Sequence, residues 1–384
     1  MIPKITHSQL QQELPVYVEA QTAMFIWGTF GIGKSDAVRQ FCIYEAARRG
    51  LEFSDKHEDI NNPKKFNFLP IILHQYEPAE LKGLPFPNEQ RDATVYLPMG
   101  LLPNNPDTHG IIFLDEFSQA SEMLKNNGYQ VVQDRRLGYW RCPDGYGVIA
   151  ASNLQSDRGF SDVNPPALNN RFLHVELMVP QVQDDGDNIG WMNGYAVKNN
   201  VHFDILSYLL SQEKMNQSKL HMYNDKEWSD DKVCCATPRM WKKVSDILRV
   251  AEKTGPLSEE RMIRILASGV GTGVATDLVA WKKMSTEYDI DAIYKNHAFK
   301  MPSAHDIAKI YSLLAAIVGY YIHKPTEANA VRLLQIAMDR STRDYTLIML
   351  NQARNSNTDF FAKVKKQQPA EWAKFAKELF PLLI

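Results

Sequence analysis

The chain has 384 residues, of which 44% are hydrophobic and 23% are charged, and its formal net charge at pH 7 is −2. This length predicts two or three domains rather than one. The balance of apolar and charged residues is typical of a globular chain and excludes a disordered one. The near-neutral charge counts against a general electrostatic attraction to nucleic acid or to an anionic membrane.

The cysteines and the apolar segments bear on the cellular compartment. Four cysteines are present, without any Cys-x-x-Cys spacing, which argues against a zinc site or a disulfide framework and is typical of a reducing cytoplasm. The opening residues, MIPKITHSQLQQ, lack the apolar core of a signal peptide. The most apolar stretch, 310–322, is shorter than the roughly 18 residues that a membrane span needs. We therefore expect a cytoplasmic protein without a membrane span.

Short apolar runs alternate with helical patterns up to about residue 180. Each run is almost continuously apolar, as expected of parallel strands that are covered on both faces. The runs predict strands at 23–28, 69–75, 110–116, 147–153 and 172–179. Because helical segments separate them, residues 1–180 are expected to form a three-layer αβα domain with a parallel five-stranded sheet.

Helical periodicity replaces the strand pattern after residue 180. The polar, turn-rich segment QVQDDGDNIG, residues 181–190, is typical of a linker. Helices are predicted beyond it at 203–212, 238–252, 258–268, 274–284, 303–321, 327–352 and 370–380. We expect a linker and helical lid over 181–285, followed by a C-terminal helical extension over 286–384.

A glycine-rich loop joins the first predicted strand to a predicted helix. Its residues fit the pattern GxxxxGK[ST], in which glycines let backbone N–H groups face phosphate oxygens. The helix N-terminus adds a favourable dipole for the same anion. The loop consists of Gly28, Thr29, Phe30, Gly31, Ile32, Gly33, Lys34 and Ser35. We expect it to bind ATP, with Lys34 at the β- and γ-phosphates and the Ser35 hydroxyl on Mg²⁺.

Polar side chains end two of the later predicted strands. Asp115 and Glu116 follow the apolar run IIFL, at the carboxyl end where open α/β sheets place ligand-binding groups. Asp115 is expected to hold Mg²⁺ and Glu116 to polarise the attacking water, an arrangement that favours hydrolysis over a simple kinase reaction. Asn153 ends the next run, VIAASN, and is a candidate to hydrogen-bond the water or the γ-phosphate.

The order of these motifs resembles that of the AAA+ ATPases, and within them the MoxR-like branch. The resemblance covers residues from about 20 to 285 and rests on GTFGIGKS, IIFLDEFSQA, VIAASNLQSDRG, PPALNNRF and ATPRMW, in that order. Residues 79–103 look like the insert that this branch carries in its second helix. Residues from about 133 to 145 look like the hairpin that precedes its sensor strand.

Several side-chain roles are implied by the resemblance. Asn153 matches the residue called sensor 1, and Arg239, in TPRMW, matches the sensor 2 arginine of the lid. Arg171, in NNRF, matches the arginine finger, which stabilises phosphoryl-transfer charge in the active site of a neighbouring subunit. Other arginines compete for this interface role: Arg135, Arg136 and Arg158. Gln75 matches the residue that switches the catalytic glutamate.

The resemblance also implies an assembly and a kind of substrate. A finger donated in trans requires a head-to-tail homo-oligomer, which in this family is usually a hexameric ring. MoxR-like ATPases remodel or mature protein substrates, commonly beside a partner with a von Willebrand factor A domain. Two alternatives stay open: a nucleic-acid-associated motor, which the near-neutral charge disfavours, and an ATP-dependent scaffold, which the intact Lys34, Asp115 and Glu116 disfavour.

Overall fold

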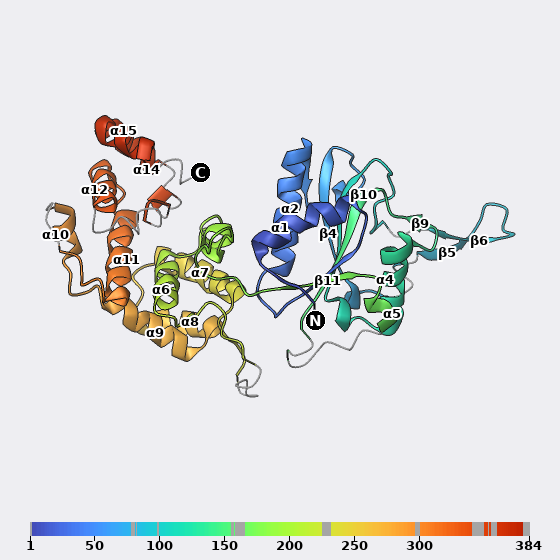
Figure 1. Ribbon diagram of the computed structural model, residues 1–384, viewed down its shortest axis with the longest axis horizontal. Helices are drawn as coiled ribbons and strands as arrows, with labels where there is room; N and C mark the ends of the chain where they lie inside the picture. The colour runs from blue at the N-terminus through green and yellow to red at the C-terminus, as the bar shows by residue number, and fades with distance from the viewer. Residues whose placement is uncertain are drawn as a thin grey trace. The chain divides into compact units, whose positions relative to one another are not determined.

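A computed structural model gives the fold of the chain (Figure 1). The structure describes residues 2–77, 81, 83–97, 100–154, 157, 166–224, 232–295, 300–339, 349–351, 353–354 and 359–378. The chain divides into two compact units, Met1–Pro180 and Gln181–Ile384. The first unit is built on a β-sheet, and the described part of the second is helical.

The sheet of the first unit has seven strands in the order β1-β11-β2-β10-β7-β4-β3, and every pairing is parallel. The five predicted strands are present, and the predicted α/β class is confirmed. They are β2 (Met24–Trp27), β4 (Lys65–Ile72), β7 (His109–Asp115), β10 (Gly145–Ser152) and β11 (Leu173–Leu177). The sheet is wider than predicted because two short strands pair at its edges, β1 (Lys4–Ile5) and β3 (Glu52–Ser54).

Helices cover both faces of this sheet, which makes the unit three-layered (Figure 1). Neighbouring residues of one strand point to opposite faces, so Phe25 belongs to one hydrophobic cluster and Ile26 to another. The Ile26 cluster packs against α1 (His7–Glu19) and α2 (Lys34–Arg49), and the Phe25 cluster packs against α4 (Glu122–Asp134). The described part of the unit also contains the shorter helical segments η1 (His57–Asp59), η2 (Leu73–Gln75), η3 (Phe117–Gln119) and α5 (Pro166–Asn169).

The ends of α1 and α2 follow from local capping chemistry. Thr6 and Gln9 form a capping box at the start of α1, which satisfies N–H groups that have no partner within the helix. Gly50 ends α2 in the left-handed conformation, with φ 69°, where glycine carries no steric cost. Arg48 and Arg49 lie in the last turn, where their positive charges interact favourably with the helix dipole.

Two hairpins extend the first unit. The strands β5 (Leu84–Pro87) and β6 (Thr94–Leu97) pair antiparallel within the expected 79–103 insert and project from the rest of the unit (Figure 1). The strands β8 (Arg136–Leu137) and β9 (Trp140–Arg141) pair within the expected 133–145 hairpin. The indole of Trp140 donates to the carbonyl of Pro103 at 2.6 Å, which ties this second hairpin to the segment after β6.

The second unit packs helices around one hydrophobic core. Its largest fully buried side chains include Trp241, Trp281 and Tyr208. Residues from the expected lid and from the expected extension both contribute, from Val182 to Phe375. The α-helices are α6 (Phe203–Lys214), α7 (Pro238–Lys253), α8 (Glu259–Val270), α9 (Thr272–Lys283), α10 (Ile290–Lys295), α11 (Ile307–His323), α12 (Glu327–Met338), α14 (Phe360–Gln367) and α15 (Pro369–Glu378), and a π-helical turn spans Met192–Ala196.

One predicted helix of the second unit is wrong in length. The pattern at 327–352 predicts a single helix, but α12 ends at Met338 because Asp339 adopts an extended conformation, with φ −62° and ψ 144°. Residues 340–348 lie outside the described part of the chain. The sequence analysis also missed α10 and α14, which are too short to show several helical repeats.

Within the described ranges, the structure contains no helix long and apolar enough to cross a membrane.

Replacing Gly110 by alanine is expected to destabilise the first unit. A Cβ atom there would lie 2.3 Å from the Asn67 carbonyl oxygen and 2.7 Å from the Tyr146 ring, so β7 has to move against β4. Overpacking of this kind costs about 2 kcal/mol. Gly100→Ala is the matched control, since a Cβ there meets nothing within 4 Å. Urea unfolding of the full chain, followed by circular dichroism, measures both variants, and equal midpoints would contradict the expectation.

Candidate functional site

The glycine-rich loop lies between β2 and α2, and its backbone conformation depends on glycine. Gly31 and Gly33 have φ angles of 74° and 93°, in the left-handed region that other residues rarely adopt. A Cβ atom at Gly28 would lie 2.8 Å from the Ile32 side chain and 3.0 Å from the Leu177 carbonyl oxygen. The loop is therefore folded tightly over the carboxyl end of β2.

Lys34 is held at this loop by three hydrogen bonds. Its ammonium group donates to the carbonyl oxygens of Gly28 at 2.7 Å and Thr29 at 3.0 Å, and to Asn153 Oδ1 at 2.9 Å. The residue is 9% exposed, so these acceptors replace the water that its three N–H donors would otherwise bind. The structure thus brings together two predicted site residues that are 119 positions apart in the sequence.

Ser35 and Asp115 are also brought into contact. The Ser35 hydroxyl donates to Asp115 Oδ2 at 2.7 Å, and Asp115 Oδ1 accepts from the backbone N–H of Glu116 at 3.0 Å. A hydroxyl and a carboxylate oxygen side by side are ligands that Mg²⁺ prefers, usually completed by water and substrate phosphate. These two side chains therefore fit the metal that the sequence predicts.

Two buried hydroxyls near the loop have no hydrogen-bond partner in the described part of the chain. They belong to Thr29, within the loop, and to Ser152, which precedes Asn153 and lies opposite Trp27 in the β10–β2 register. A buried polar atom without a partner costs free energy, and native proteins rarely tolerate it. These unpaired groups beside the loop fit a site that is completed by a polar ligand.

Glu116 lies at the carboxyl end of β7 in a strained backbone conformation. Its φ of 52° and ψ of 35° are left-handed, which is uncommon for a residue with a side chain and is often found at functional sites. Its Oε2 lies 3.2 Å from Nδ1 of His74, which belongs to η2. Both side chains are partly exposed, at 44% and 36%. The glutamate is therefore within reach of solvent water.

The sequence analysis missed His74 and named its neighbour Gln75. The two residues end the same apolar run, and only the geometry of the turn decides which of them faces Glu116. The pairing of β4 with β7 could have indicated His74, since Ile72 lies opposite Asp115 in the sheet. A polar residue one or two positions after Ile72 therefore lies beside Glu116.

Arg171 lies away from the loop contacts described above, against α4. Its guanidinium lies over the Tyr129 ring, 4.7 Å from the centroid, and its Nε donates to Gln133 Oε1. The residue is exposed on the first unit. Its side chain is therefore held on the outer side of α4.

The other predicted arginines have different surroundings. Arg135 donates to the carbonyl oxygens of Pro143 and Tyr146, both at 2.8 Å, and so fastens the β8–β9 hairpin to β10. Arg136 lies 3.8 Å from Asp134 and is exposed. Arg239 is exposed on the first turn of α7, in the second unit, and Arg158 lies outside the described residues. Arg135 thus has a structural role in the hairpin.

Comparisons with known proteins give only distant likenesses. No protein-family model and no curated protein matches the sequence. The chain is similar to NtrX from Brucella abortus in complex with ADP, with 13% identity and a TM-score of 0.35 over 98% of this chain and 68% of that one. It is also similar to a putative ATPase from Cytophaga hutchinsonii, with 11% identity and a TM-score of 0.31 over 97% and 81%.

A third similar structure is the K64R mutant of RuvB from Thermotoga maritima, with 12% identity and a TM-score of 0.26 over 82% of this chain and 87% of that one. All three TM-scores are below 0.5, so the likenesses carry no conclusion about this chain. The case for its site rests on the contacts among its own residues.

Replacing Asp115 by asparagine tests the metal assignment. We expect the variant to bind ADP without metal as the parent does, and to lose about 10- to 100-fold of the Mg²⁺-dependent gain in affinity, because the carboxylate charge that attracts the metal is gone. Titration of a fluorescent ADP analogue, with and without Mg²⁺, measures this gain. Asp107→Asn, on an exposed loop, is the control. An unchanged Mg²⁺ effect in Asp115→Asn would remove Asp115 from the metal site.

Proposed function

We propose that this chain is a Mg²⁺-dependent ATPase, with ATP bound at the loop of residues 28–35. The observation that carries the proposal is the meeting of four side chains at one edge of the sheet. Lys34 contacts Asn153, and Ser35 contacts Asp115. These pairs join the loop after β2 to the ends of β10 and β7, and their residue types are those that phosphoryl transfer requires.

Each side chain has a distinct part in the proposed hydrolysis. The loop N–H groups and Lys34 bind the phosphates, with Lys34 giving up carbonyl contacts for phosphate oxygens. Ser35 and Asp115 would hold Mg²⁺, which supplies charge neutralisation for the transferred phosphoryl group. Glu116 accepts the proton of the attacking water at its carboxylate. The Asn153 amide orients the water or the γ-phosphate.

His74 is a positioning residue in this scheme. Its Nδ1 lies 3.2 Å from Glu116 Oε2, so it acts on the glutamate rather than on the nucleotide. The left-handed backbone at Glu116 and this side-chain contact together fix where the carboxylate lies. A base fixed in this way reaches its water with less loss of conformational freedom.

More specifically, we propose an AAA+ ATPase of the MoxR-like branch. The support is the ordered set of motifs in the sequence, together with the hairpins near residues 84–97 and 136–141 and the helical second unit. Arg171 then completes the active site of the next subunit in a homo-oligomeric, hexameric ring. Its exposure on the first unit supports a role in trans. Arg239 serves as the sensor 2 arginine of the lid.

The proposed work of the ring is the remodelling or maturation of partner proteins. This part rests on the resemblance to the MoxR-like branch and on the near-neutral charge, which gives no general attraction to nucleic acid. A protein with a von Willebrand factor A domain is the proposed partner. Co-purification of the tagged chain with such a candidate, in ATP and in ADP, tests this step separately from hydrolysis.

Replacing Glu116 by glutamine is expected to abolish turnover and preserve binding. The amide keeps the shape of the side chain and cannot accept the proton, so the hydrolysis rate should fall by about 100-fold or more. Phosphate release measures the rate, and a fluorescent ATP analogue measures binding. Glu122→Gln, in the exposed first turn of α4, is the matched control. Unchanged turnover would exclude Glu116 as the base.

Replacing Arg171 by alanine tests sharing of the site between subunits. The variant should lose about 100-fold or more of its activity because the transition-state charge is no longer stabilised. Lys34→Ala protein is inactive for a different reason, the loss of the phosphate-binding cation. Mixing the two restores turnover if one subunit supplies the loop and its neighbour supplies the arginine.

Arg136→Ala protein, mixed in the same way, is the control for exposed arginines of the first unit. Absence of recovered phosphate release at every mixing ratio of the Arg171 and Lys34 variants would exclude Arg171 as the finger. Recovery with Arg136→Ala in its place would move the role to Arg136.

A further inference from the structure

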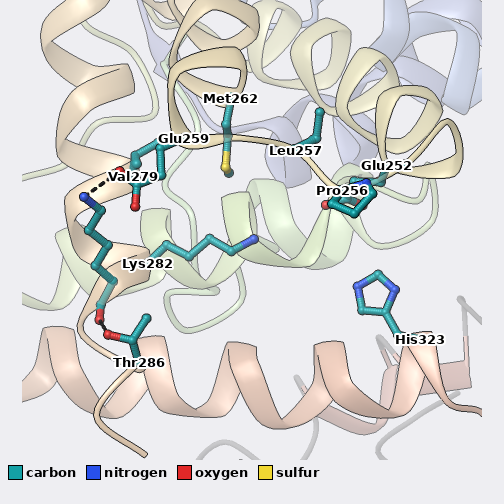
Figure 2. Close-up of a pocket in the computed structure, with 11 residues that line it drawn as sticks. Glu252, Pro256, Leu257, Glu259, Met262, Val279, Lys282, Thr286 and His323 are labelled. Atoms are coloured by element: carbon teal, nitrogen blue, oxygen red, sulfur yellow. Dashed lines mark hydrogen bonds and ion pairs between the residues drawn. The ribbon is translucent and has the colours of Figure 1, made fainter.

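The second unit contains a pocket that the proposed ATPase site does not use. Its volume is about 570 Å³, which is within the range of small-molecule sites. It lies between the end of α7, the start of α8, α9 and the end of α11 (Figure 2). Figure 2 shows the side chain of Lys282 extended into the middle of this pocket, with His323 and Met262 around it.

A smaller pocket of about 280 Å³ adjoins the first. Three side chains line both: Glu252, Lys282 and His323. The smaller pocket continues toward the start of α6, and α11 leaves room for it with small residues, Ala315, Ala316 and Gly319. The two pockets therefore meet at these three side chains, and both lie within the second unit.

The walls of the larger pocket are apolar between the charged groups. Leu257, Met262 and Val279 line it together with the ring of Pro256. Such walls favour a ligand with an apolar body, because removing apolar surface from water is favourable.

Every carboxylate that lines the two pockets already has a basic partner. Asp204 pairs with Lys282, and Glu259 pairs with Lys283 at 2.6 Å. Glu252 lies 3.0 Å from His202 Nε2. Although burial raises it, contact with Lys282 lowers the pKa of Asp204 overall, and the hydrogen bond from His202 does the same for Glu252. Asp204 and Glu252 are therefore ionised.

Arg249, in contrast, lines the smaller pocket without a carboxylate of the described residues in direct contact, and the charges of Glu252 and Asp246 act on it only from farther away. Its Nη2 donates to the Val201 carbonyl oxygen at 3.2 Å, its buried Nε has no hydrogen-bond partner, and no carboxylate within the described ranges lies in ion-pair contact with it. Burial lowers the pKa of this guanidinium. A partly buried cation without a direct ion pair is costly. An anion from solution would remove that cost, and the guanidinium fork matches carboxylate and phosphate oxygens.

We propose that the second unit binds a small molecule with an anionic group at Arg249 and an apolar body in the larger pocket. The anionic group is a carboxylate or a phosphate, and both chemistries suit the guanidinium. The body extends past Lys282 and His323 to the walls formed by Leu257, Met262 and Val279. This site is separate from the loop of residues 28–35 and does not depend on the proposed ATPase activity.

The experiment compares probes that share one apolar body and differ in charge. Isothermal titration calorimetry of the full chain, saturated with Mg²⁺ and ADP, uses octanoate, octyl phosphate and octylammonium. Saturable one-to-one binding is expected for at least one of the two anions, and the preferred anion identifies the head group. Octylammonium should bind about tenfold more weakly or not at all.

Two variants locate the site. Arg249→Gln should weaken anion binding by about tenfold, since the charge-assisted hydrogen bonds to the anion are lost. Gly319→Leu should abolish it, because a Cβ atom at Gly319 meets nothing within 4 Å and Gly319 lines the smaller pocket, where the larger leucine side chain would take up the space. Gly273→Leu is the matched control: it is a helical glycine with the same free space that lines neither pocket.

The melting temperature and ADP affinity of each variant verify its fold. If Arg249→Gln does not fold, Gly319→Leu still decides, because it adds no buried charge and replaces a helical glycine. Absence of saturable binding of both anions would overturn the proposal. Equal affinity for octylammonium, or undiminished anion binding in Gly319→Leu, would overturn it as well.

Discussion

The position of β10 between β2 and β7 is the constraint on which the candidate site depends. Parallel strands end at the same edge of a sheet, so the segments that follow them meet there. The loop after β2 reaches Asn153 at the end of the adjacent β10, and Ser35 at the start of α2 reaches Asp115 at the end of β7. Any other strand order would separate these pairs.

The same constraint extends to the neighbouring strand. Because β4 pairs with β7, the turn after Ile72 carries His74 to Glu116. The chemistry-bearing residues therefore come from four consecutive strands of the sheet, and each strand contributes at its carboxyl end. The two hydrophobic clusters fix this arrangement, since they hold α1 and α2 on one face and α4 on the other.

The loop of residues 28–35 and the pockets of the second unit differ in how their charged side chains are paired. At the loop, the Lys34 ammonium is satisfied by two carbonyl oxygens and an amide oxygen, all of which are neutral. Phosphate oxygens can displace these neutral acceptors, because a charged acceptor forms the stronger hydrogen bond with an ammonium group. In the pockets of the second unit the lining carboxylates each contact a basic side chain, whereas no carboxylate in the described part of the chain directly contacts the Arg249 cation. Both sites therefore favour an anionic ligand, the loop through Lys34 and the pockets through Arg249.

The second unit shows how a helical core sets cavity shape. Trp241, Trp281 and Tyr208 fill its centre, and the small residues of α11 leave space at its side. Packing at the density of protein interiors normally closes such spaces. The pockets are lined by charged side chains that form ion pairs, such as Lys282 with Asp204 and Lys283 with Glu259. Closing the space would bury these groups and separate them from their partners.

Local sequence determined much of this protein. Apolar runs of six to eight residues that alternate with helical patterns located β2, β4, β7, β10 and β11. The loop of residues 28–35 and the pair Asp115-Glu116 were recognisable because their chemistry is contiguous in the chain. The start and stop signals of α2 were equally local.

Only the tertiary structure decided the rest. The edge strands β1 and β3 are too short to carry a pattern, and they exist because β11 and β4 offer unpaired backbone groups. The choice of His74 over Gln75 depends on the direction of one turn, and the contact of Arg171 with Tyr129 and Gln133 depends on where α4 packs. The pockets around Arg249 are lined by six helices, α6 to α11, and the spacing of these helices is set by side-chain packing between residues far apart in sequence.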